Sequence, residues 1–222
     1  MFKDIKQVMK DSVLYGIGNV AVKLVGFILI PLYTDAEYFS TADYGLMGLL
    51  EVTSQILIAV MGLSLYSGLI RWYWDAEYRD KQKTIFFTTL LFTILTSLCI
   101  GSVLWLNVGE LSALLVQQEG YSLGGELPYI LQLLILTSML GAVVEVPQNL
   151  LRLQRKPIYY SLTNIVRLFA TLVLTIYFTI SLHRGVSGVY EAQLVGIAIQ
   201  LLMVLPLVIK NSSCRVDRKC TI

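Results

Sequence analysis

Charged residues are scarce in this 222-residue sequence, and their scarcity limits what the chain can be. Only 14% of the residues are Asp, Glu, Lys or Arg, whereas 56% are hydrophobic. Soluble globular domains carry about 25% charged residues, so a soluble domain is excluded. The formal net charge is +2, which provides no broad basic field for a nucleic-acid partner. The composition instead predicts a chain that is surrounded by lipid.

Histidine and cysteine are rare as well. His183 is the single histidine, Cys99 lies inside an apolar run, and Cys214 and Cys220 lie in the C-terminal tail. The sequence has no Cys-x-x-Cys pair and no His/Cys cluster with the spacing of metal ligands. We therefore expect no metal site, no cofactor and no disulfide framework.

One short motif, Gly185-Val186-Ser187-Gly188, matches the Gly-x-Ser-Gly sequence of rhomboid proteases, which also have six membrane helices. The serine of those proteases needs a histidine from a later helix to accept its proton. Here the single histidine, His183, precedes the serine on the same short connection. We interpret the motif as part of a loop and expect no enzyme activity.

Long apolar runs are abundant. A helix needs about 20 apolar residues to cross a hydrocarbon core of about 30 Å. Six runs meet this requirement: 12–33, 44–70, 85–106, 128–151, 158–181 and 188–209. The first run is longer than the apolar part of a signal peptide and has no small-residue cleavage site after it, so we expect it to be retained. The sequence predicts an all-α membrane protein with six transmembrane helices in one bundle over 12–209.

The connections between the runs differ in basic residues. Three Lys or Arg residues lie in 1–11, four in 71–84, three in 152–157 and four in 210–222, whereas the opposite set of connections carries only Arg184. The positive-inside rule therefore places both termini, the segment 1–11 and the basic tail 210–222, in the cytoplasm. The longest external connection, 107–127, contains Gly-Gly and is expected to be an irregular loop.

Two basic side chains, Lys23 and Arg167, lie inside apolar runs. Lys23 is near the midpoint of the first run, where its side chain cannot easily reach either interface. Each belongs to a polar stripe at helical spacing: Tyr15, Asn19 and Lys23 in the first run, and Ser161, Asn164, Arg167, Thr171 and Thr175 in the fifth. Polar stripes at this depth must face other helices or water.

Acidic side chains lie in other runs, with Glu51 in the second and Glu145 in the fourth. A charge at bilayer depth costs about 2.5–3.5 kcal/mol on insertion scales. One interpretation is that these acids pair with the two buried cations and hold the bundle together. The other is that the charges line a hydrophilic path, which is where intramembrane ionisable groups are usually found. We favour the path.

Three stretches of the sequence occur in a characteristic order. The first is Lys23-Leu-Val-Gly-Phe-Ile-Leu-Ile-Pro-Leu-Tyr-Thr34, followed by Asp43-Tyr44-Gly45. The second is Gly62-Leu63 followed by Arg71-Trp-Tyr-Trp-Asp75, and the third is Pro147…Leu151-Arg152…Lys156-Pro157…Tyr160. Their order and spacing over about residues 10–170 resemble the bacterial polysaccharide flippases, which form the polysaccharide transporter family of the multidrug/oligosaccharidyl-lipid/polysaccharide (MOP) superfamily.

The resemblance implies a function, a place and a set of partners. Such a protein flips polyprenyl-diphosphate-linked oligosaccharide repeat units across the bacterial cytoplasmic (inner) membrane by alternating access during polysaccharide biosynthesis. Members have two six-helix lobes around a central, often cationic cavity, so this chain would correspond to the amino-terminal lobe. Expected partners are the lipid-linked substrate, membrane lipids, and a missing C-terminal lobe, a second copy or polymerase machinery.

The resemblance and the buried charges together suggest roles for particular residues. Lys23 and Arg167 would stabilise the diphosphate at mid-depth. The polar side chains beside them, Asn19, Asn164 and Thr171, would bond sugar hydroxyls. Glu51 or Glu145 would couple transport to an ion gradient or form ion pairs.

Two other functions remain open at this point. One is a secondary transporter of the same superfamily that extrudes drugs or organic cations, which should need uncompensated carboxylates in its interior. The other is a membrane scaffold or truncated product without transport activity.

Overall fold

The computed structural model describes residue 16 and residues 27–35, 37–75, 80–116 and 125–211. Within these ranges the chain is helical and has no strand. Five helices in the described ranges are long and apolar enough to cross a membrane. Within the described ranges, the prediction of an all-α membrane protein is therefore confirmed. Of the first expected run, 12–33, residue 16 and residues 27–33 are described, and all of them are helical.

The helices follow one another through short connections. Their bounds are α2 (Thr41–Gly62), α3 (Leu65–Tyr73), α4 (Gln82–Leu106), α5 (Val108–Val116), α6 (Leu127–Leu153), α7 (Pro157–Ile176), the π-helical turn η2 (Tyr177–Ser181) that continues α7, and α8 (Gly185–Asn211). The last four expected runs coincide with α4, α6, α7 with η2, and α8 to within three residues at either end.

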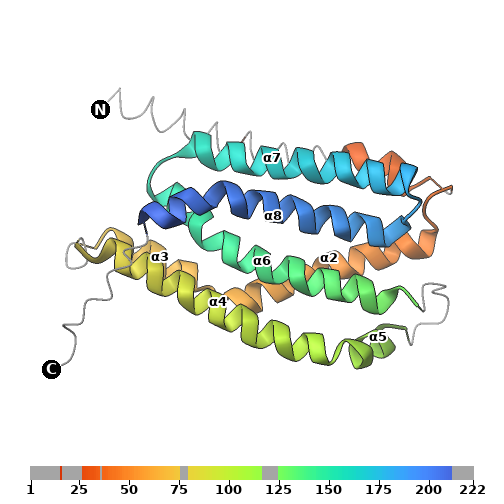
Figure 1. Ribbon diagram of the computed structural model, residues 1–222, viewed down its shortest axis with the longest axis horizontal. Helices are drawn as coiled ribbons and strands as arrows, with labels where there is room; N and C mark the ends of the chain where they lie inside the picture. Colours follow the sequence, from red (N-terminus) through yellow and green to blue (C-terminus); the bar gives the residue numbers. More distant parts are fainter. Residues whose placement is uncertain (1–15, 17–26, 36, 76–79, 117–124, 212–222) are drawn as a thin grey trace.

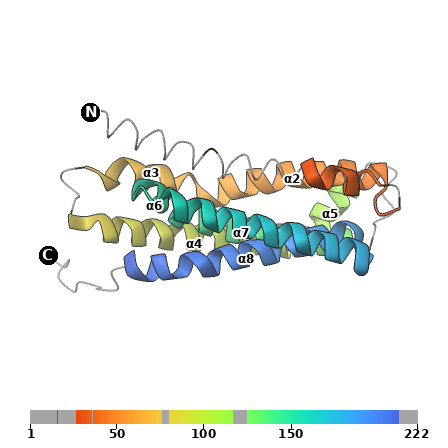
Figure 2. The same cartoon turned by 90° about the horizontal axis from the view of Figure 1, so that it is seen from above.

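Helix α6 occupies the centre of the bundle. It packs against α2, α4 and α8, while α7 packs mainly against α8. In Figure 1, α4 and α7 lie at opposite edges of this array, with α6 and α8 between them. Figure 2 shows the long helices running side by side along the bundle. The central position explains why α6 carries the largest set of buried side chains among the described helices.

Local sequence signals explain where several helices begin. Ser40 and Asp43 form a capping box at the start of α2, in which Ser40 Oγ accepts from the Asp43 amide over 3.1 Å and Asp43 accepts from the Ser40 amide over 2.9 Å. Pro128 and Pro157 lie in the first turns of α6 and α7, where no amide hydrogen is needed.

The bundle has two ends. The α6–α7 end contains the turn at residues 154–156, and the α7–α8 end contains the turn at residues 182–184.

The second expected run, 44–70, is not one helix. Helix α2 ends at Gly62, Leu63 and Ser64 adopt left-handed backbone with φ of 46° and 49°, and α3 starts at Leu65. The Oγ1 of Thr96 on α4 lies 2.8 Å from the Met61 carbonyl oxygen and replaces a hydrogen bond that the break removes. The expectation of one continuous span over this run is therefore wrong.

The connection 107–127 also differs from the expected irregular loop. Its first half forms α5, which packs against α6 beside the end of α4. Asn107 separates the two helices, and its Nδ2 donates to the Val103 carbonyl over 2.7 Å. Most residues of the segment 108–116 favour helix, and the Gly-Gly pair comes only after it.

Candidate functional site

A polar cavity of about 330 Å³ lies along one face of α7, between α2, α6 and α8. Asn164, Arg167 and Thr171 line it from α7, and their spacing of three and four residues places them on one side of that helix. The other polar lining residues are Glu51, Ser54 and Gln55 of α2, Thr137 of α6 and Gln193 of α8. This part of the predicted polar stripe therefore faces the interior of the bundle.

An amide of the neighbouring helix holds Arg167 at mid-depth. Arg167 lies near the middle of the span Pro157–Ser181, and its Nη1 donates to Oε1 of Gln200 over 3.1 Å. Gln200 is 1% exposed and donates through Nε2 to Oδ1 of Asn164 over 2.8 Å. Both polar ends of the Gln200 amide are thus used, which orients the amide and holds the guanidinium at the cavity wall.

A glycine allows α7 and α8 to approach closely beside this network. A Cβ added at Gly196 would collide with Oγ1 of Thr171 and would lie 3.3 Å from the backbone oxygen of Arg167. Gly196 therefore sets the helix separation at which the Arg167–Gln200 hydrogen bond forms.

A second cavity, of about 240 Å³, continues from Arg167 toward the α6–α7 end. Helix α6 lines it with Glu145, Gln148, Asn149 and Arg152, which recur every three or four residues and so share one face. The guanidinium of Arg152 lies 4.6 Å from the centre of the Tyr160 ring and donates to the hydroxyl of Tyr160. These contacts hold a second cation at this end of the cavity.

A third cavity, of about 230 Å³, lies against the break between α2 and α3. Its polar lining is Gln55, Ser64, Tyr66 and the carboxylate-bearing Glu145. All three cavities share Ile58, and the second and third share Glu145. They form a contiguous polar track through an otherwise apolar bundle, from mid-depth to the α6–α7 end.

The charges along the track are mixed. Glu51 and Glu145 contribute two carboxylates, and Arg152 and Arg167 contribute two guanidinium groups. Neither carboxylate is within 4.0 Å of Arg167, and neither forms an ion pair with another described residue. Among the described residues the track thus carries separated charges of both signs. Ion pairing between helices does not explain this arrangement, because the charges are not paired with one another. Separated charges of both signs can bind a polar molecule.

The structure brings most of the predicted site residues together. Arg167, Asn164 and Thr171 line the first cavity with Glu51, and Glu145 lines the second and third. The remaining two, Asn19 and Lys23, lie outside the residues that the structure describes. Their predicted roles stay predictions.

Sequence reasoning missed three glutamines of the site. Gln200 and Gln193 of α8 are seven residues apart and therefore share a face, and Gln148 of α6 is buried beside Asn149. Amides inside apolar runs carry no formal charge, so they do not stand out as Lys23 or Arg167 do. The seven-residue spacing of Gln193 and Gln200 was the signal that could have revealed a polar face on α8.

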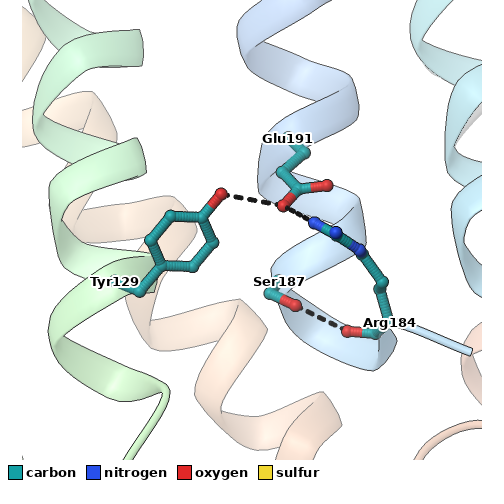
Figure 3. A network of polar contacts seen from close by, with 4 residues as sticks. All are labelled: Tyr129, Arg184, Ser187 and Glu191. Atoms are coloured by element: carbon teal, nitrogen blue, oxygen red, sulfur yellow. Dashed lines mark hydrogen bonds and ion pairs between the residues drawn. The ribbon is translucent and has the colours of Figure 1, made fainter.

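The α7–α8 end of the bundle carries a separate network of polar contacts, shown in Figure 3. Arg184 forms an ion pair with Glu191, whose Oε1 also accepts from the Tyr129 hydroxyl over 2.8 Å. Ser187 donates to the Arg184 carbonyl over 2.7 Å. The Gly-x-Ser-Gly motif is therefore the first turn of α8 rather than a loop, which corrects the expectation, and its serine is used in starting the helix.

Comparison with known proteins gives no relative. No protein-family model, no curated protein and no solved structure matches this sequence.

Proposed function

We propose that this chain is a transporter of lipid-linked oligosaccharides, which moves polyprenyl-diphosphate-linked repeat units from the cytoplasmic to the outer leaflet of a bacterial inner membrane. The observation that carries the proposal is the polar track of α2, α6, α7 and α8, with Arg167 at its mid-depth. A diphosphate must cross the apolar layer together with its sugars, and both need polar partners there.

The chemistry of the track supports this class of substrate. Arg167 and Arg152 offer guanidinium groups, which form strong charge-assisted hydrogen bonds with phosphate oxygens. Asn164, Thr171 and Gln193 offer amide and hydroxyl groups that can donate to and accept from sugar hydroxyls. The resemblance to polysaccharide flippases, drawn from residues 10–170, favours the same substrate.

The proposal includes an arrangement in the membrane. The chain has six spans, with the first over 12–33, and both termini and the basic α6–α7 end in the cytoplasm. In this arrangement the polar track opens from mid-depth toward the leaflet in which the substrate is made. The chain acts as one lobe of the transporter, completed by a second lobe or a second copy, and it moves its substrate by alternating access.

Flipping of a fluorescent polyprenyl-diphosphate oligosaccharide in liposomes tests the proposal. The full chain is reconstituted, and the labelled lipid that becomes accessible to a membrane-impermeant quencher is followed over time. Wild-type protein should raise the rate above that of protein-free liposomes, and Arg167→Ala should abolish the increase. Phe169→Ala is the matched control, because Phe169 lies on the same helix and is 63% exposed on its outer face.

Either of two results would contradict the proposal. One is wild-type flipping by Arg167→Ala at an equal amount of inserted protein. The other is a wild-type rate equal to that of liposomes without protein. Insertion is measured by the protein recovered in floated liposomes, so a failure to insert is distinguished from a failure to flip.

A second candidate function is the efflux of organic cations. It is favoured by Glu51 and Glu145, two carboxylates of the track that have no ion pair among the described residues. The same liposomes discriminate the two functions. An efflux protein would transport a fluorescent organic cation and lose that activity in Glu51→Gln or Glu145→Gln, with no flipping of the lipid-linked oligosaccharide.

A further inference from the structure

The break between α2 and α3 lies inside the bundle, at the third cavity. Leu63 and Ser64 both have left-handed backbone, with φ of 46° and 49°, although neither is glycine. A side chain with a Cβ disfavours this conformation. Such strain persists only where the surrounding structure holds it, and it concentrates at ligand sites and switch regions.

The last turn of the broken helix borders the cavity. The last turn of an α-helix leaves carbonyl groups without partners in the helix, and these groups form the negative end of its dipole. Two carbonyls of this turn already have partners, since that of Met61 accepts from Thr96 over 2.8 Å and that of Val60 accepts from the Leu63 amide over 3.3 Å. Ala59 and Gly62 of the same turn line the third cavity. Ser64 also lines this cavity, and its hydroxyl makes no hydrogen bond that would cap α3.

A carboxylate faces this break from the central helix. The Oε2 of Glu145 lies 4.0 Å from the position that a Cβ would occupy on Gly62, the last residue of α2. Glu145 is half-buried, and among the described residues its carboxylate has no ion pair within 4.0 Å. A carboxylate at this depth needs a positive or hydrogen-bonding partner.

A second oxygen nearby also lacks a partner. Gln148 is one turn beyond Glu145 on α6, is 8% exposed, and lines the second cavity with it. Its Nε2 donates to Thr163 over 2.9 Å, but its Oε1 is buried without a hydrogen-bond partner. Buried acceptors are normally satisfied, so this oxygen indicates a missing donor or cation.

The ligand atoms point to a small, hard cation. We infer that a sodium ion binds where the second and third cavities meet, with oxygens from the Glu145 carboxylate, the Gln148 amide, the Ser64 hydroxyl and the end of α2. The coordinating atoms are all oxygens, which suit hard cations. Carbonyl groups at interrupted membrane helices coordinate Na⁺ in transporters. One carboxylate neutralises one monovalent ion, whereas a divalent ion would leave a buried net charge.

The basic side chain on the same face of α6 does not occupy this position. Arg152 is seven residues beyond Glu145, which places it about 10 Å further along the helix axis. Its guanidinium contacts Tyr160 and lies within 3.5 Å of Asn149 Oδ1. The inferred ion site is therefore separate from the Arg152 end of the second cavity.

Equilibrium binding of radioactive sodium to the purified full chain in nanodiscs tests the inference, with choline chloride holding the ionic strength constant. We expect saturable binding that excess unlabelled sodium displaces. Glu145→Gln should reduce bound sodium to the displaced background, and Ser64→Ala should weaken binding by about tenfold. Glu110→Gln is the control and should bind as the wild type does, because Glu110 is an exposed carboxylate of α5 that lines none of the three cavities.

Three results would overturn the inference. They are the absence of saturable sodium binding to the wild type, binding by Glu145→Gln equal to that of the wild type, and a loss in the Glu110→Gln control equal to that in Glu145→Gln. Each variant is first checked for a single peak in size-exclusion chromatography. If Glu145→Gln aggregates, Ser64→Ala and Gln148→Leu provide the same test. The assay involves no transport, so its outcome is independent of the flipping experiment.

Discussion

The Arg167–Gln200 hydrogen bond provides a quantitative test of how the site is held together. We consider a double-mutant cycle of the wild type, Arg167→Met, Gln200→Met and the double variant. Methionine keeps the length of each side chain approximately but removes its polar groups. The cycle isolates the interaction between the two residues from the separate effects of each substitution.

The structure sets the expected size of the coupling. A hydrogen bond with a charged partner contributes about 1.5–3 kcal/mol in soluble proteins. Hydrogen bonds between membrane helices contribute less, on average about 0.6 and at most about 1.7 kcal/mol. The donor is charged, the N–O distance is 3.1 Å and Gln200 is 1% exposed. We therefore expect a coupling free energy of about 1–2 kcal/mol, near the upper end of the membrane range.

Unfolding in mixed micelles measures the coupling. Each protein is titrated with dodecyl sulfate, and its free energy of unfolding is obtained from tryptophan fluorescence. A control cycle combines Gln200→Met with Phe169→Ala, which lies on the exposed face of α7 and should show additivity to within about 0.5 kcal/mol. A coupling between Arg167 and Gln200 no larger than that of the control would refute the network.

Two further substitutions test the packing and the helix break. Gly196→Ala should lower the free energy of unfolding by about 1–3 kcal/mol, because its Cβ collides with Thr171. Adding Thr171→Ala should recover part of this loss. Gly48→Ala is the control and should not destabilise the protein, because nothing lies within 4 Å of the added Cβ. The same titration would contradict this packing if Gly196→Ala and Gly48→Ala behaved alike. Leu63→Gly should raise the free energy of unfolding by about 0.5–1 kcal/mol, because glycine adopts left-handed backbone without the Cβ penalty and the Leu63 side chain is 56% exposed. A marked loss of stability on that change would show that the Leu63 side chain, and not its backbone, determines the break.

Much of the helical architecture follows from the length of apolar runs, because a lipid-surrounded chain must satisfy its backbone polar groups within each helix. That constraint predicted α4, α6, α7 and α8 closely. It did not predict the break after Gly62, since no proline marks it and the two left-handed residues are a leucine and a serine. It also did not predict α5, because a short helix and a loop differ little in composition over nine residues.

The candidate site was predictable in part for a related reason. Charged residues inside apolar runs are conspicuous, and helical spacing correctly placed Asn164, Arg167 and Thr171 on one face. The partner of Arg167 was not predictable, because it depends on how α8 is rotated against α7. The observed rotation places the neutral Gln200, and neither Glu51 nor Glu145, within hydrogen-bond distance of Arg167.

The central claim is that α7 carries a hydrated face which lines the polar track, and thiol labelling tests it most directly. In a chain with its native cysteines replaced by serine, single cysteines are introduced on the cavity face by Asn164→Cys and Thr171→Cys. Phe169→Cys and Val173→Cys place them on the exposed outer face, which meets lipid in the membrane. A charged, membrane-impermeant methanethiosulfonate should modify the first pair in intact membranes and leave the second pair unmodified. Equal modification of all four positions, or of none, would contradict a water-filled track along α7.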